Sequence, residues 1–165
     1  MITTDANFIS VVHEPKWSAR IYRDGKKEGI VLTPGEQFSD ELQSSNGGSN
    51  PVCAMSVAYF MGCQISARSL LNAEIEKRKM IEAKGIVATR TLPDSNEDDA
   101  SCLINYTLLY PLNDPKAERL PFAVRYRFVK RETGVLRFEV RARDFFIERA
   151  TEAATEIFES VAIKS

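Results

Sequence analysis

Two segments near the C-terminal end of the chain alternate apolar and polar residues with the period of a β-strand. They span residues 122–128 and 135–142, and a turn containing Gly134 separates them. Two such runs joined by a short turn indicate an antiparallel hairpin. From Asp144 onward, apolar residues recur every three or four positions, which predicts an amphipathic helix. The end of the chain therefore predicts a two-stranded unit that a helix covers.

The alternation also predicts that the hairpin has one apolar and one basic face. We expect the apolar face to carry Phe122, Val124, Tyr126, Phe128, Leu136, Phe138, Val140 and Ala142. The opposite face then forms an arginine ladder, with Glu139 as its only acid, made of Arg125, Arg127, Arg137, Arg141 and Arg143. The helix from Asp144 should pack on the face that bears Phe138 and Val140.

The remainder of the chain predicts a mixed domain. Strands are expected near residues 8–12, 20–22, 30–32, 52–60, 86–92 and 102–110, and a long helix over 66–84 with Ser66 as its N-cap. Residues 40–51, rich in Gly, Ser and Asn, should form a flexible loop. Strands joined by short turns favour antiparallel pairing. We therefore expect an α+β fold: an antiparallel β-sheet of five to seven strands, with a long middle helix and a C-terminal helix packed on it. The 165 residues suit a single domain, 1–165.

Composition narrows the classes of function. The chain has 22 Lys and Arg residues against 23 Asp and Glu residues, so its overall charge favours neither nucleic acid nor a membrane surface. Its apolar stretches are far shorter than the roughly 20 residues of a membrane span. The N-terminal residues lack the basic start and apolar core of a secretory signal, which favours a cytoplasmic protein. A chain whose signal had been removed would look the same.

Residues suited to catalysis or metal binding are few. His13 is the only histidine, and its neighbours indicate the end of a strand. A pair between His13 and Cys53 is the one nucleophile and base that folding could bring together, but no surrounding motif supports it. One histidine and three scattered cysteines, Cys53, Cys63 and Cys102, lack metal-ligand spacing. We expect no enzyme activity, no cofactor and no metal, with a small enzyme using a cysteine nucleophile as an alternative.

Several short motifs together carry a family resemblance. They are Pro15-Lys16-Trp17 after the first expected strand, Ser69-Leu70-Leu71 at the start of the long helix, the four later strand segments and Ile157-Phe158-Glu159-Ser160-Val161. Over nearly the whole chain this pattern resembles the PsbP/DcrB-like superfamily. An acidic turn at residues 94–99 replaces the glycine that the superfamily has between the two strands after the helix.

The resemblance implies partner binding rather than catalysis. Members of the superfamily include a photosystem accessory subunit, bacterial lipoproteins, a nuclear-import factor that binds the Ran GTPase and chaperones for effectors of type VI secretion. A lipid-attachment signal is absent from this sequence, which points to the cytosolic adaptor or chaperone type. An exported accessory subunit whose signal was removed is the second alternative.

The arginine ladder is the candidate partner-binding surface. Guanidinium groups hold carboxylates and phosphates through paired hydrogen bonds. The ordinary alternative is a solvated strand face. Since no aromatic residues interleave with the arginines on their expected face, single-stranded nucleic acid would lack a stacking platform. We therefore expect a noncatalytic, macromolecule-binding adaptor or chaperone with an acidic protein partner. A secreted effector is one form that this partner could take. A monomer and a homodimer both fit the sequence.

Overall fold

The computed structural model describes residues 1–34, 53–81, 86–91, 95–110 and 115–164. The elements in chain order are β1 (Ile2–Asp5), β2 (Ile9–His13), β3 (Trp17–Asp24), β4 (Lys27–Pro34), β5 (Ala54–Met61), α2 (Ala67–Ile81), β6 (Ile86–Thr91), β7 (Asp99–Tyr110), β8 (Glu118–Arg131), β9 (Gly134–Arg143), the 3-10 turn η1 (Asp144–Phe146), α3 (Ile147–Glu159) and β10 (Ala162–Ile163). The expected loop over 40–51 lies outside the described residues.

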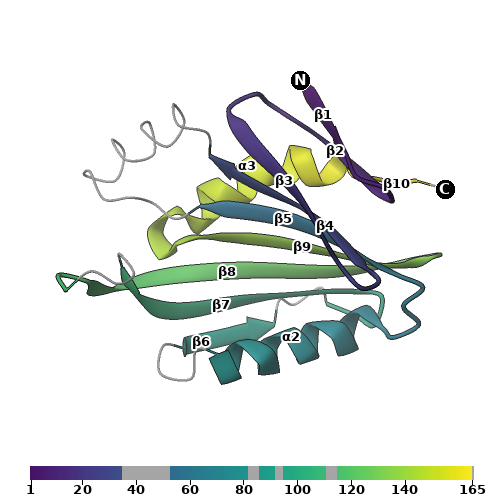
Figure 1. Ribbon diagram of the computed structural model, residues 1–165. Coiled ribbons are helices and arrows are strands. Elements are labelled where there is room, and N and C mark those ends of the chain that lie inside the picture. The colour runs from purple at the N-terminus through teal and green to yellow at the C-terminus, as the bar shows by residue number, and fades with distance from the viewer. Residues whose placement is uncertain (35–52, 82–85, 92–94, 111–114, 165) are drawn as a thin grey trace.

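The strands form one large and one small antiparallel sheet. Within the described residues the large sheet has seven strands in the order β3-β4-β5-β9-β8-β7-β6, and the small sheet has the order β1-β2-β10. Both ends of the chain lie at the small sheet (Figure 1). The expected α+β class with an antiparallel sheet is confirmed. The sequence analysis missed β1 and β10, because strands of four and two residues show too little alternation to be recognised.

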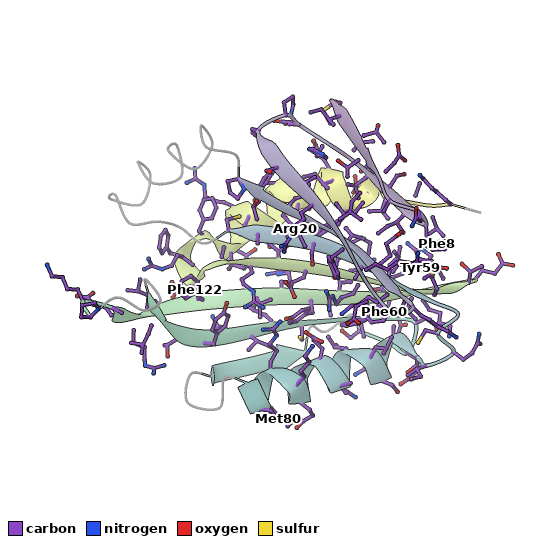
Figure 2. All side chains as sticks on the ribbon, viewed as in Figure 1. Phe8, Arg20, Tyr59, Phe60, Met80 and Phe122 are labelled. Carbon is purple, nitrogen blue, oxygen red and sulfur yellow. The ribbon has the colours of Figure 1, made fainter. Side chains whose placement is uncertain are left out.

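The helices α2 and α3 pack on different faces of the large sheet. α3 contacts β9, β8 and β2, and it buries Ile147, Ala150, Ala154 and Ile157. α2 contacts β7 and β8 (Figure 1) and buries Ala67, Leu71 and Ile75. Met80 projects from the outer side of α2 (Figure 2). The Ser66 hydroxyl accepts a hydrogen bond from the Ser69 N–H at 3.1 Å, which confirms the expected N-cap. Each helix therefore seals its own apolar core.

The register of the β8–β9 hairpin contradicts the expected division into an apolar and a basic face. Directly opposed residues share a face, and the observed pairs are Phe122 with Arg143, Val124 with Arg141, Tyr126 with Glu139 and Phe128 with Arg137. Arg125 and Arg127 lie opposite Val140 and Phe138, on the α3 side. The prediction that five arginines form one ladder on a single face is wrong. Arg125 and Arg127 share one face, and Arg137, Arg141 and Arg143 share the other.

The length of the hairpin turn explains this correction. Arg131 pairs with Gly134, so only Glu132 and Thr133 connect the strands, whereas the sequence had suggested a longer turn. A shift of one residue in register moves every side chain of one strand to the other face. The expected position of the C-terminal helix is nevertheless confirmed, because Phe158 of α3 packs on Phe138 with ring centroids 4.8 Å apart.

A buried carboxylate joins the N-terminal segment to the large sheet. Glu28 in β4 is only 1% exposed. Its Oε1 accepts a hydrogen bond from the Asn7 N–H at 3.0 Å, and its Oε2 accepts from Phe8 at 2.6 Å and Ile9 at 3.3 Å. The Lys164 N–H in turn donates to the Phe8 carbonyl at 2.8 Å. Glu28 thus anchors the small sheet, including its C-terminal strand, to the core.

Candidate anion-binding site

A polar pocket of about 320 Å³ opens on the α2 side of the large sheet, over β3, β4, β5 and β9. We call it the basic pocket. Its charged lining consists of five basic side chains, Arg20, Lys27, Lys77, Arg78 and Arg137, and two carboxylates, Glu74 and Glu139. Arg20 projects from β3 over the sheet (Figure 2), and Lys77 reaches the pocket from α2. Positive charge therefore predominates in this pocket although the whole chain is nearly neutral.

Both carboxylates of the basic pocket already have basic partners. Arg78 Nε lies 3.5 Å from Glu74 Oε1, and Arg78 Nη2 lies 4.0 Å from Glu139 Oε1. Arg141 Nη2 lies 4.0 Å from the same Glu139 oxygen. These four side chains form an alternating chain of charges from α2 to β9. The two acids offset part of the pocket's positive charge, and its basic side chains still outnumber them five to two.

Arg137 is the most buried cation of the basic pocket and differs from its neighbours. It is 8% exposed, and its Nη2 donates to the Tyr22 hydroxyl at 3.2 Å. The guanidinium carbon lies 5.9 Å from the centroid of the Phe60 ring. Its Nε is sealed from solvent without a hydrogen-bond acceptor, and no carboxylate of the described residues forms an ion pair with it. A buried charge in this state is costly, because it has lost its hydration without gaining a counter-ion.

A glycine positions Tyr22, the hydrogen-bond partner of Arg137. Tyr22 pairs with Gly29 on the neighbouring strand, and a Cβ at position 29 would lie 2.2 Å from the Tyr22 ring. Only glycine lets the ring lie across β4 at this point. Burial raises the pKa of Tyr22, and the nearby Arg137 partly offsets this effect. The phenol is therefore protonated at neutral pH, so its oxygen accepts from Arg137 while its O–H proton remains available to a ligand.

The other two arginines on this face are engaged by aromatic residues. Arg141 donates from Nη1 to the Tyr106 hydroxyl at 3.3 Å and from Nη2 to the Tyr126 hydroxyl at 3.4 Å. Arg143 Nε donates to the Pro121 carbonyl at 3.3 Å, and its guanidinium stacks near the rings of Phe122 and Phe145. Both side chains serve mainly to cover the aromatic residues of the sheet.

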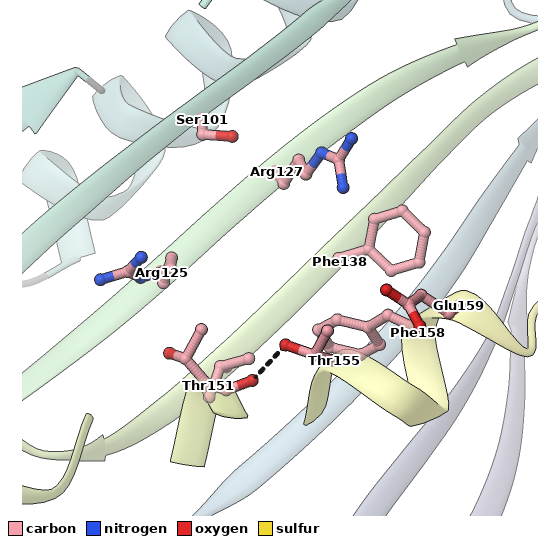
Figure 3. Close-up of a pocket in the computed structure, with 9 residues that line it drawn as sticks. Ser101, Arg125, Arg127, Phe138, Thr151, Thr155, Phe158 and Glu159 are labelled. Carbon is pink, nitrogen blue, oxygen red and sulfur yellow. Dashed lines mark hydrogen bonds between the residues drawn. The ribbon is translucent and has the colours of Figure 1, made fainter. Parts of the chain in front are cut away.

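Arg125 and Arg127 line a separate cavity of about 240 Å³ between α3 and the sheet (Figure 3). Arg127 makes paired hydrogen bonds to Asp99, from Nε to Oδ1 at 2.9 Å and from Nη2 to Oδ2 at 2.7 Å. These bonds lower the pKa of Asp99. Arg125 Nη2 donates to Glu148 Oε1 at 2.8 Å, although its Nε lacks an acceptor. Both arginines have their own carboxylates, so this cavity offers less to an anion than the basic pocket does.

The histidine and two of the three cysteines that the sequence offered for catalysis are buried in the fold. His13 is 2% exposed. Its Nδ1–H donates to the Glu14 carbonyl at 2.9 Å, and its Nε2 is hydrogen-bonded to the Thr4 hydroxyl at 2.8 Å. Burial raises the pKa of both Cys53 and Cys102 to about 12, which disfavours the reactive thiolate. Among the described residues, no group of three His, Cys, Asp or Glu side chains could hold a metal ion.

Sequence reasoning found Arg137 but missed Arg20, Tyr22, Lys27 and Lys77. One signal was present, because a glycine inside a strand often marks a close approach of another group, and Gly29 follows this rule. The contact between Tyr22 and Arg137 joins positions 115 residues apart, so no local pattern could reveal it.

Comparisons with known proteins leave the family open. No family model and no curated protein matches this chain. Among solved structures, the chain is similar to the crystal structure of LpqN, involved in cell envelope biogenesis of Mycobacterium tuberculosis, with 13% sequence identity and a TM-score of 0.38. The alignment covers 95% of this chain and 83% of that chain. This likeness is too low to support an inference about function. No helix in the described part of the chain is long and apolar enough to cross a membrane.

Proposed function

We propose that this protein is a noncatalytic adaptor or chaperone, and that its basic pocket receives an acidic segment of a protein partner. The observation that carries this proposal is the excess of cations at the pocket. Arg20 and Lys77 are exposed at its rim, and neither contacts a carboxylate within the described residues. Exposed cations that face one opening attract and orient an acidic partner.

The proposal changes which arginines of the expected ladder bind the partner. Arg137 is kept as a partner-binding residue and gains Arg20 and Lys77 as neighbours. Arg125 and Arg127 are assigned to internal ion pairs, and Arg141 and Arg143 to contacts within the sheet. The PsbP/DcrB-like type remains part of the proposal. It is supported by the order of the elements, in which α2, four antiparallel strands and α3 follow the first strands.

A charge-reversal experiment tests the pocket. The double variant Arg20→Glu and Lys77→Glu should bind a fluorescent glutamate-rich peptide about tenfold or more weakly than the wild type, with a flatter dependence on salt. The matched control reverses Arg119 and Arg131, two exposed cations of β8 outside the pocket. Titration by fluorescence anisotropy at low and physiological salt measures both effects.

The control separates this pocket from general charge attraction. It carries the same change in net charge, so it should keep most of the wild-type affinity. Equal loss in both double variants would show that the peptide responds to overall charge only. Undiminished binding by the Arg20 and Lys77 variant would contradict the proposed function.

A further inference from the structure

Arg137 has hydrogen-bonding capacity that the described residues do not use. A guanidinium group carries five N–H donors, and the hydrogen bond from Nη2 to Tyr22 engages one of them. Of its nitrogens without a partner, only Nε is sealed from solvent. Because Arg137 lines the basic pocket, Nη1 is the group left to face it. A buried side chain thus presents unpaired donors to an open cavity.

Two other arginines of the hairpin form ion pairs with carboxylates of the protein itself. Arg127 meets Asp99 through two hydrogen bonds, and Arg125 meets Glu148. Arg137 is buried, yet its contacts, Tyr22 and Phe60, are both neutral. A neutral hydroxyl and a ring face hold a guanidinium in place without balancing its charge. Glu74 and Glu139 line the same pocket, but within the described residues neither forms an ion pair with Arg137, so a bound carboxylate would add a counter-charge directly at the guanidinium.

We infer that Arg137 is the anchor for one carboxylate of the bound segment, with the Tyr22 hydroxyl as a further donor. Nη1 and the remaining Nη2 donor face the carboxylate, and Lys27 adds positive charge from the pocket wall. Lys27 Nζ lies 5.7 Å from the Tyr22 ring centroid and 5.9 Å from that of Phe60, so these two rings also hold the second cation. That the carboxylate belongs to a protein segment rests on the proposed function; the anion site itself does not.

Nuclear magnetic resonance of the arginine side chains tests the site directly. The Arg137 Nε–H is shielded from solvent, which favours its detection, and the spectrum of Arg137→Lys assigns its signal. Glutarate and a glutamate-rich peptide should both shift this signal in the wild type. Inorganic phosphate serves as the comparison anion. A shift with phosphate alone would overturn the assignment of a carboxylate, and no shift with any probe would overturn the anion site.

Thermal unfolding distinguishes a binding residue from a structural one. Arg137→Met should unfold at an equal or higher temperature than the wild type, because it removes a buried cation that lacks a counter-ion. Glutarate should raise the unfolding temperature of the wild type and leave that of the variant unchanged. The matched control Arg127→Met should unfold at a lower temperature while keeping the response to glutarate. A structural role for Arg137 would instead show as a lower unfolding temperature and no response to glutarate in either protein.

Further outcomes keep the two proposals separate. If Arg137→Met fails to fold, Arg137→Lys retains the charge without the planar fork and should bind glutarate several-fold more weakly. Unchanged binding by that variant would overturn the inference. A wild type that binds glutarate through Arg137 but not the glutamate-rich peptide supports the anion site and contradicts the proposed function. Peptide binding that depends on Arg20 and Lys77 but does not shift the Arg137 signal supports the proposed function and contradicts the role of Arg137 as anchor.

Discussion

Two buried ionic side chains, Glu28 and Arg137, illustrate different solutions to the same physical problem. A charge removed from water needs hydrogen bonds or an opposite charge to compensate for its lost hydration. Glu28 receives backbone N–H groups from the turn before β2, which form charge-assisted hydrogen bonds inside the protein. Within the described residues, Arg137 donates only one side-chain hydrogen bond, to the neutral hydroxyl of Tyr22. At the scale of the residue, this difference separates a structural carboxylate from a candidate binding residue.

The role of Glu28 predicts a large loss of stability on a minimal change. In Glu28→Gln an amide NH₂ replaces one of the two accepting oxygens and faces N–H donors. The free energy of unfolding should fall by about 1.5–3 kcal/mol, the range for lost hydrogen bonds to a charged group. Glu132→Gln, at the exposed β8–β9 turn, is the matched control and should change little. Urea denaturation measures both, and equal stability of the two variants would contradict the anchoring role.

At the scale of the element, the β8–β9 hairpin shows why alternation alone is an incomplete guide. Both strands alternate as expected, but the two-residue turn places each arginine of β9 opposite an apolar residue of β8. It also places Glu139 opposite Tyr126. Arginine tolerates such a position because its aliphatic stem packs on aromatic rings while its guanidinium reaches a polar partner. Arg143 over Phe122 and Arg141 over Tyr106 are examples. Each face of this hairpin therefore carries both arginines and apolar residues, and neither face is purely apolar.

The ion pair between β7 and β8 predicts a dependence of stability on pH. Because Arg127 holds the pKa of Asp99 below 3.8, its value in a model compound, the folded state favours the ionised carboxylate. The resulting stabilisation is present above pH 3.8 and is lost as the pH falls through the lowered folded-state pKa. Since both side chains are partly exposed, it should amount to only about 0.5–1 kcal/mol.

Comparison of two neighbouring acids tests this expectation. Asp99→Asn should be less stable than the wild type near neutral pH and equally stable at strongly acidic pH. The control is Asp98→Asn, which changes the exposed neighbour of Asp99. Its stability should equal that of the wild type at every pH. Urea denaturation across the pH range measures the difference. A difference between Asp99→Asn and the wild type that does not shrink with acidification would contradict the assignment to this ion pair.

At the scale of the whole molecule, α3 and α2 enclose separate cores on the two faces of one sheet. Cys53 belongs to the core on the α3 side, and Cys102 belongs to the core on the α2 side. Cys63 is only partly buried and is a free thiol like the other two. The reactivity of each cysteine thiol therefore reports the solvent access of a different region: the surface, the core on the α3 side or the core on the α2 side.

Thiol labelling should follow this arrangement. In the folded protein Cys63 should react first, because Cys53 and Cys102 combine burial with a pKa raised to about 12. Denaturant should release the two slow thiols as their cores open. Mass spectrometry after timed labelling identifies each site, and Cys63→Ser should remove the fast phase. Labelling of Cys53 as fast as Cys63 in the native protein would contradict the burial described here and strengthen the alternative of a cysteine enzyme.

The amino-acid sequence by itself determined the kind and order of most elements, though not of β1 and β10, because alternation, helical spacing and caps are local. The strands around residues 8–12 and 30–32, the Ser66 cap and the helix after Asp144 are examples. Tertiary structure alone decided which arginines are neutralised. Asp99 of β7 reaches Arg127 on the neighbouring strand β8, and Tyr22 of β3 reaches Arg137 of β9 over the two strands between them. A one-residue change in register would exchange the faces. The basic pocket exists because that register places Arg137 beside Tyr22, without an ion pair to either carboxylate of the pocket within the described residues.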